Sequence, residues 1–147
     1  MSASEYDPLE LWDQAGEQPY EVLKEEGLLD EFLKRLDKTY YDLSKHLFRG
    51  THRHYEKSIG DVIVYDYPSS WSSSDKVAQR FIDGEDHKVI LRFITTGLIK
   101  AVENTKNSYD EQEFILHPML LSIVGKHLID TEIGEVILFD VVLDKYL

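Results

Sequence analysis

The chain has 147 residues, 42% of them hydrophobic, a formal net charge of −12 and no cysteine. This composition is typical of one folded globular domain, and it excludes disulfides and thiolate metal sites. The negative charge argues against unaided binding to nucleic acid or to an anionic membrane, and it favours a basic protein partner or simply solubility. No apolar run approaches the roughly 20 residues of a membrane span, and no secretory signal is evident, so we expect a cytoplasmic protein.

The first 46 residues predict a helical segment. Pro19 suits the first turn of a helix through PYEVLKEE, and Gly27 suits its end. Across residues 28–47 apolar side chains recur every three or four positions, which predicts one amphipathic helix. Its apolar stripe consists of Leu29, Phe32, Leu33, Leu36, Tyr40, Leu43 and Leu47. We expect Trp12 to pack against these helices.

The pattern changes near Leu47 to short runs rich in β-branched and aromatic residues, which predict strands. One helix is expected among them, over residues 72–82, with Ser74 or Asp75 as N-cap and with Val77 and Phe81 on one face. The chain is therefore predicted to be a single α+β domain over residues 1–147, in which a helical front end (1–46) packs on a mostly antiparallel β-rich core (47–147). The predicted strands are 46–51, 61–67, 88–94, 98–102, 113–117, 121–129 and 135–143.

Two short motifs are candidates for binding chemistry. Arg49 lies between Phe48 and Gly50 at the end of a predicted strand. Its guanidinium can grip phosphate oxygens bidentately, and the glycine lets a ligand approach the backbone. The alternative is an ordinary surface arginine. The serines of residues 69–74 precede the predicted helix, where a turn and an N-cap are the simpler interpretation.

A third motif contains two carboxylates, Glu111 and Glu113, just before an apolar run. If this segment is extended, both point to the same face with Cα atoms about 6.5 Å apart. Two such carboxylates repel each other unless a cation lies between them or one becomes protonated. A solvated pair on a surface strand is the alternative.

Taken in chain order, these motifs resemble those of the mono-ADP-ribosyltransferases of the Arg-Ser-Glu class, in particular those that modify arginine. That family has an aromatic-Arg-Gly strand end, then aromatic-x-Ser-Thr-Ser with A-x-x-F, then E-x-E before apolar residues and a proline. The corresponding residues here are Phe48-Arg49-Gly50, Trp71-Ser72-Ser73-Ser74 with Ala78 and Phe81, and residues 108–118. The resemblance covers residues 46–143. Ser73 replaces the usual threonine, and a shift of one position would place Ser73 or Ser74 where Ser72 is aligned.

The resemblance implies the split β core of that family and a reaction in which the nicotinamide–ribose bond of NAD is cleaved without a metal. Glu113 would stabilise the cationic transition state and bond the ribose 2′-hydroxyl. Ser72 would hold Glu113 in position. Arg49 would bind the NAD diphosphate or the nearby ribose, and the backbone of Gly50 would meet the nicotinamide amide. Trp71, or a nearby tyrosine, would stack on the nicotinamide ring.

The resemblance also implies an acceptor. Glu111 would orient an arginine guanidinium and help to remove its proton, because the family has glutamine there when the acceptor is not arginine. Ser108, Tyr109 and Asp110 would form the turn that faces the target. The expected partners are NAD and a cellular protein that presents arginine, with neither nucleic acid nor membrane. A phage or bacterial effector acting in a host cytoplasm fits this description.

Two other functions remain open on this fold. An NAD glycohydrolase would use the same site with water as acceptor. A non-catalytic acidic module would instead bind or inhibit a partner. The His-x-His spacing of His52 and His54 can ligate a metal, but no third ligand is evident nearby, so a surface loop is predicted there.

Overall fold

The computed structural model describes residues 12, 19–43, 46–95, 97–104 and 112–147. The front end contains helix α2 (Pro19–Glu25) and helix α3 (Leu29–Lys38). Gly27 separates them with a φ of 73°, a left-handed conformation that glycine adopts without strain. The predicted first helix is confirmed. None of the helices described is long and apolar enough to cross a bilayer.

The second predicted helix is shorter than expected. It ends at Lys38, and residues Tyr40–Leu43 form strand β1 instead of continuing the helix to Leu47. Thr39, Tyr40 and Tyr41 favour extended backbone, and β6 offers β1 an antiparallel partner across four residue pairs. Local periodicity was therefore overridden by strand pairing.

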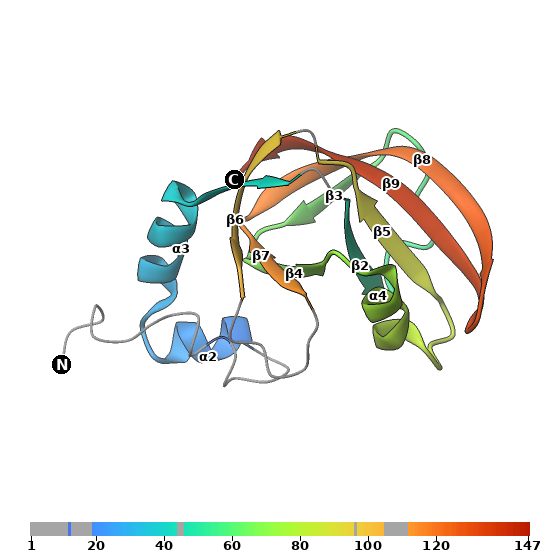
Figure 1. The fold of residues 1–147 in the computed structure, drawn as a ribbon, viewed down its shortest axis with the longest axis horizontal. Coiled ribbons are helices and arrows are strands. Elements are labelled where there is room, and N and C mark those ends of the chain that lie inside the picture. The colour runs from blue at the N-terminus through green and yellow to red at the C-terminus, as the bar shows by residue number, and fades with distance from the viewer. Residues whose placement is uncertain (1–11, 13–18, 44–45, 96, 105–111) are drawn as a thin grey trace.

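The described residues form nine strands in one sheet, in the order β1-β6-β7-β4-β2-β5-β9-β8-β3 (Figure 1). Every neighbouring pair is antiparallel except β5 and β9, which confirms the mostly antiparallel core. All seven predicted strands are present, whereas β1 and β4 were missed. The strands are β1 (Tyr40–Leu43), β2 (Leu47–Thr51), β3 (Val62–Tyr65), β4 (Ser69–Ser72), β5 (Val89–Phe93), β6 (Gly97–Glu103), β7 (Glu113–Leu116), β8 (Met119–Thr131) and β9 (Gly134–Tyr146).

Helix α4 (Asp75–Ile82) lies against β2 and β5, away from α2 and α3 (Figure 1). Ser74 is its N-cap residue, as predicted, but its side chain makes no capping hydrogen bond. Val77 and Ile82 are buried, whereas Phe81, one turn after Val77, is 63% exposed and adds little to the core. The helix packs closely because β2 has a glycine at position 50.

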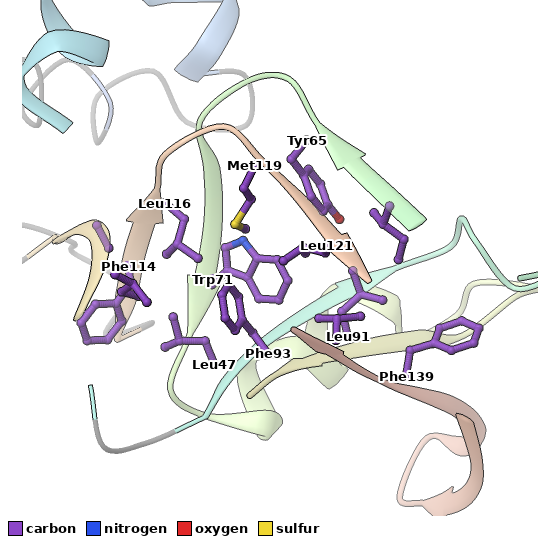
Figure 2. Close-up of a cluster of buried hydrophobic side chains, with 14 of the residues drawn as sticks. Leu47, Tyr65, Trp71, Leu91, Phe93, Phe114, Leu116, Met119, Leu121 and Phe139 are labelled. Atoms are coloured by element: carbon purple, nitrogen blue, oxygen red, sulfur yellow. The ribbon is translucent and has the colours of Figure 1, made fainter. Parts of the chain in front are cut away.

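Three apolar clusters hold these elements together. The largest fills the inner side of the curved sheet, where the indole of Trp71 lies among Phe93, Met119 and Leu121 (Figure 2). A smaller one lies beneath α4. The third joins the front end to β7 and consists of Trp12, Leu23, Leu28, Phe32, Leu36 and Ile115. Trp12 therefore packs against the front-end helices, as predicted.

Candidate active site

Glu113, the first residue of β7, carries a buried carboxylate that accepts hydrogen bonds from three side chains. The amide of Asn104 donates to Oε1 at 2.8 Å. The hydroxyl of Ser70 and the indole N–H of Trp12 both donate to Oε2, the latter at 3.1 Å. These donors come from the end of β6, from β4 and from the front end. A buried carboxylate needs such partners, because its burial without them would be costly.

Alternation along β4 decides which serines face Glu113. Ser72 is opposite Glu113 in the β4–β7 ladder, and Ser70 is opposite Ile115. Since side chains alternate between faces, Ser70 and Ser72 point to the face that carries Glu113. The hydroxyl of Ser70 donates a hydrogen bond to Glu113. The hydroxyl of Ser72 accepts a hydrogen bond from the backbone N–H of Ser74 at 3.0 Å.

Arg49 contacts strand β4 from β2, the neighbour of β4 on the side opposite to β7. Strands β2 and β4 pair only at Phe48 and Ser72, so the sheet opens beyond that point. The guanidinium of Arg49 donates through Nη1 to the backbone carbonyl of Ser70 at 2.7 Å. Ser70 therefore contacts both Arg49 and Glu113, and it brings together two residues that are far apart in the sequence.

The guanidinium of Arg49 is partly buried and has spare donor capacity. Its Nε is buried without a hydrogen-bond partner, the only such side-chain atom in the described part of the chain. Its Cζ lies 5.3 Å from the centre of the Tyr65 ring, a cation–π contact. Burial raises the pKa of the Tyr65 hydroxyl, and the cation of Arg49 opposes that rise. An anion that accepts from Nε would satisfy the orphaned donor.

The surroundings of Arg49 are basic in an otherwise acidic chain. Burial lowers the pKa of His54, and the nearby charges of Lys57, Arg53 and Arg49 lower it further. His54 is therefore neutral at pH 7, while the three cations remain. This local positive potential suits a phosphate-bearing ligand.

One predicted ligand contact, that of Trp71, is placed differently by the structure. Trp71 is 1% exposed in the main core, and its indole N–H donates to Ser69 Oγ at 2.8 Å. It is on the strand face opposite to Glu113 and buried, so the prediction that Trp71 stacks on a nicotinamide ring is wrong, whereas the alternative of a nearby tyrosine stays a prediction. Gly50 lies in β2 next to Arg49, and its α-carbon packs against α4. A Cβ added at Gly50 would lie 2.2 Å from the carbonyl oxygen of Ala78.

The backbone is not extended at Gln112, the residue between the two glutamates. Gln112 has a φ of 50°, so the chain turns immediately before β7 begins at Glu113. Ser73 holds this turn, because its hydroxyl donates to Gln112 Oε1 at 2.6 Å. Glu111, Ser108, Tyr109 and Asp110 lie outside the described residues.

Three site residues were missing from the sequence prediction. Ser70 carries a signal, because it lies two positions before Ser72, but only if residues 69–72 are known to be a strand. Asn104 and Trp12 carry none, since nothing in their neighbourhood links them to Glu113. No group of three potential metal ligands was found within the described ranges.

No family model matches the chain, and no curated protein matches its sequence. Solved structures do match. Plx2a, an ADP-ribosyltransferase toxin from Paenibacillus larvae, is similar with a TM-score of 0.68 and 14% identity, over 94% of this chain and 86% of that toxin. Vis toxin, an ADP-ribosyltransferase from Vibrio splendidus, has a TM-score of 0.61 and 16% identity, over 96% and 69% of the two chains. Vis has also been solved with agmatine.

A third match is BECa, an ADP-ribosylating toxin of a binary enterotoxin of C. perfringens, solved with NADH. It has a TM-score of 0.58 and 13% identity, over 80% of this chain but 35% of the toxin. The chain therefore has the fold of the ADP-ribosyltransferase toxins, which confirms the fold that the sequence motifs implied.

Proposed function

We propose that this protein is an NAD-dependent mono-ADP-ribosyltransferase that cleaves the nicotinamide–ribose bond and transfers ADP-ribose to arginine side chains of target proteins. The observation that carries this proposal is the connection through Ser70, which bonds Glu113 with its hydroxyl and Arg49 with its carbonyl. An anion-binding cation and a fixed carboxylate meet there on a fold that ADP-ribosylating toxins share. Structural likeness at this level of identity supports the fold, and the residues support the chemistry.

NAD fits the residues around Arg49. The partly buried guanidinium of Arg49 and the basic side chains of Arg53 and Lys57 would meet the diphosphate. The backbone of Gly50, next to Arg49 in β2, would meet the nicotinamide amide. BECa has been solved with NADH, which contains the same diphosphate, so a dinucleotide is compatible with the fold.

Glu113 would serve the bond-breaking step. Loss of nicotinamide leaves positive charge on the ribose, and a carboxylate aimed at that charge stabilises it more in the transition state than in the ground state. The carboxylate would also accept a hydrogen bond from the ribose 2′-hydroxyl. Ser70 would hold Glu113, with Ser72 beside it on the same strand face.

Arginine is the proposed acceptor because Glu111 is the first glutamate of the E-x-E motif. In that position a carboxylate would orient the arginine that receives the ADP-ribose. A carboxylate beside a guanidinium pairs with it, orients it and assists loss of its proton. Ser108, Tyr109 and Asp110 would contact the target protein. Vis toxin has been solved with agmatine, which carries a guanidinium group. The net charge of −12 favours a target with a basic surface, which we expect in the cytoplasm of a host cell.

The acceptor is tested by incubating the protein with labelled NAD and either agmatine or a cell lysate, followed by mass spectrometry of the modified residues. We expect ADP-ribose on arginine. Glu111→Gln should abolish transfer to agmatine while nicotinamide release into water continues.

Arginine transfer that persists in Glu111→Gln, or label on another residue type, would contradict the proposed acceptor. Nicotinamide release with no modified acceptor would instead indicate an NAD glycohydrolase. A chain that neither releases nicotinamide nor transfers label would indicate the non-catalytic binding module.

A further inference from the structure

Trp12 reaches the proposed catalytic carboxylate from a position 101 residues away in the sequence. Its indole N–H donates to Glu113 Oε2, the oxygen that also accepts the hydroxyl of Ser70. Trp12 is 4% exposed and Glu113 is 7% exposed, so the contact is shielded from water. A hydrogen bond to a charged group in such surroundings is among the stronger interactions in a protein.

The indole is fixed by packing. Its ring stacks on that of Phe32 in α3, with centroids 5.5 Å apart and an interplanar angle of 23°. Leu23, Leu28 and Leu36 of the front end complete the same cluster, together with Ile115 of β7. Ile115 lies two residues from Glu113 and points to the same face of the sheet. The apolar cluster therefore places the indole N–H beside the carboxylate.

We propose that Trp12 is a positioning residue for Glu113, so that the helical front end takes part in catalysis by orienting the carboxylate. This inference rests on the proposed function. Asn104 donates to one oxygen of Glu113, while Ser70 and Trp12 donate to the other, so rotation of the carboxylate would break bonds on both sides. An indole N–H only donates, which suits an ionised carboxylate. Catalytic groups lose efficiency steeply when their orientation is lost.

The test separates the indole N–H from the packing of the ring. Trp12→Phe keeps an aromatic ring beside Phe32 but removes the donor. We expect kcat for nicotinamide release to fall about tenfold, the effect of losing one hydrogen bond to a charged group. The KM for NAD should change by less than about twofold, because the lost interaction acts in the transition state.

Leu36→Val is the matched control, because it loosens the same apolar cluster and leaves both the Trp12–Phe32 ring stack and the indole N–H in place. It should lower Tm about as much as Trp12→Phe while it retains most of kcat. A wild-type kcat in Trp12→Phe would overturn the proposal. Equal losses of kcat in both variants would do the same, since packing alone would then explain them.

A second readout needs no activity. The chain has two tryptophans, and the indole N–H of Trp71 bonds Ser69 rather than Glu113. In a nitrogen–proton NMR spectrum, Glu113→Gln should shift the Trp12 indole signal and leave that of Trp71 in place. An unshifted Trp12 signal would overturn the inference. If the wild-type chain releases no nicotinamide, the proposed function fails and Trp12 has no reaction to serve. If wild type and Trp12→Phe are equally active, the inference alone fails.

Discussion

Ser70 has two neighbours that define the site, because its hydroxyl donates to Glu113 and its carbonyl accepts from Arg49. The sequence motifs had pointed to Ser72, which lies on the same face of β4 and opposite Glu113 in the ladder. Both serines are therefore on the strand face of the carboxylate, and of the two it is Ser70 that donates a hydrogen bond to it. This difference has a kinetic consequence.

Ser70→Ala should lower kcat for nicotinamide release about tenfold, because one charge-assisted hydrogen bond is lost from Glu113. Ser72→Ala, the matched substitution two residues away, should have the smaller effect. Steady-state kinetics of the two variants, at equal Tm, provides the comparison. A larger loss in Ser72→Ala than in Ser70→Ala would favour the alignment that the sequence motifs predicted.

Strand β2 and helix α4 approach each other closely at Gly50. A Cβ there would lie 2.2 Å from the carbonyl oxygen of Ala78 and 3.1 Å from Cγ2 of Ile82. The first of these is a backbone atom, so a rotamer change cannot relieve the overlap. Since β2 also carries Arg49, a displacement of α4 would disturb the site as well as the core.

Gly50→Ala should lower the free energy of unfolding by roughly 1–3 kcal/mol, the usual cost of overpacking a close contact. Urea unfolding would measure it. Ala78→Gly in the same chain should not restore stability, because the overlapping atom belongs to the backbone. Wild-type stability in Gly50→Ala would show that the helix shifts without cost.

The strands that the sequence predicted share a clear local signal. Residues 89–93 and 134–146 are rich in β-branched and aromatic side chains, and both form strands. Two elements were missed for different reasons. The three-to-four periodicity of α3 continues past Thr39, although the backbone there pairs with β6. Strand β4 is mostly serine, and it is a strand because β7 pairs with it along its whole length.

The sequence motifs named two residues of the candidate site that the structure brings together, and tertiary contacts supply the others. Arg49 and Glu113 were found from sequence, and the structure links them through Ser70. The other partners of Glu113 depend on long-range contacts. Trp12 comes from the front-end segment, and Asn104 follows β6, so neither adjoins Glu113 in the sequence. No local pattern encodes such an approach, because packing of α2, α3 and the sheet creates it.

Three neighbouring strands of the sheet, β5, β9 and β8, are linked on the α4-bearing face by a group of charged side chains. Asp140 of β9 accepts from Arg92 of β5 at 2.5 and 3.1 Å, and it contacts His127 of β8 at 2.9 Å. Hydrogen bonding to Arg92, with a further contribution from His127, holds the pKa of Asp140 below 3.8, although burial opposes this effect. The contribution to stability is present above the unfolded-state pKa and is lost as pH falls through the folded-state pKa.

Asp140→Asn should therefore destabilise the protein by about 2 kcal/mol at neutral pH, because the charged pair across three strands is broken. The difference from wild type should shrink at an acid pH below the unfolded-state value of about 3.9, as the pH falls toward the depressed folded-state pKa of Asp140. Urea unfolding at both pH values provides the measurement. A difference that does not change with pH would show that Asp140 acts through packing rather than charge.

The arrangement of the elements places the proposed reaction between the two helical parts of the molecule. Strand β4 lies between β7, which the front end covers, and β2, on which α4 packs (Figure 1). The front end supplies Trp12, which bonds Glu113, and α4 packs on β2, the strand that carries Arg49. The proposed cleavage of NAD at this junction would require both Glu113 and Arg49, with Ser70 between them.

The decisive measurement is the rate of nicotinamide release from NAD by the wild-type chain and by Glu113→Gln, with agmatine present and absent. The wild-type chain should release nicotinamide, and Glu113→Gln should lower kcat by about a hundredfold or more at an unchanged Tm, because the charge that stabilises the ribosyl cation is removed. A wild-type chain that leaves NAD intact, or a glutamine variant as fast as wild type, would contradict this account of the site.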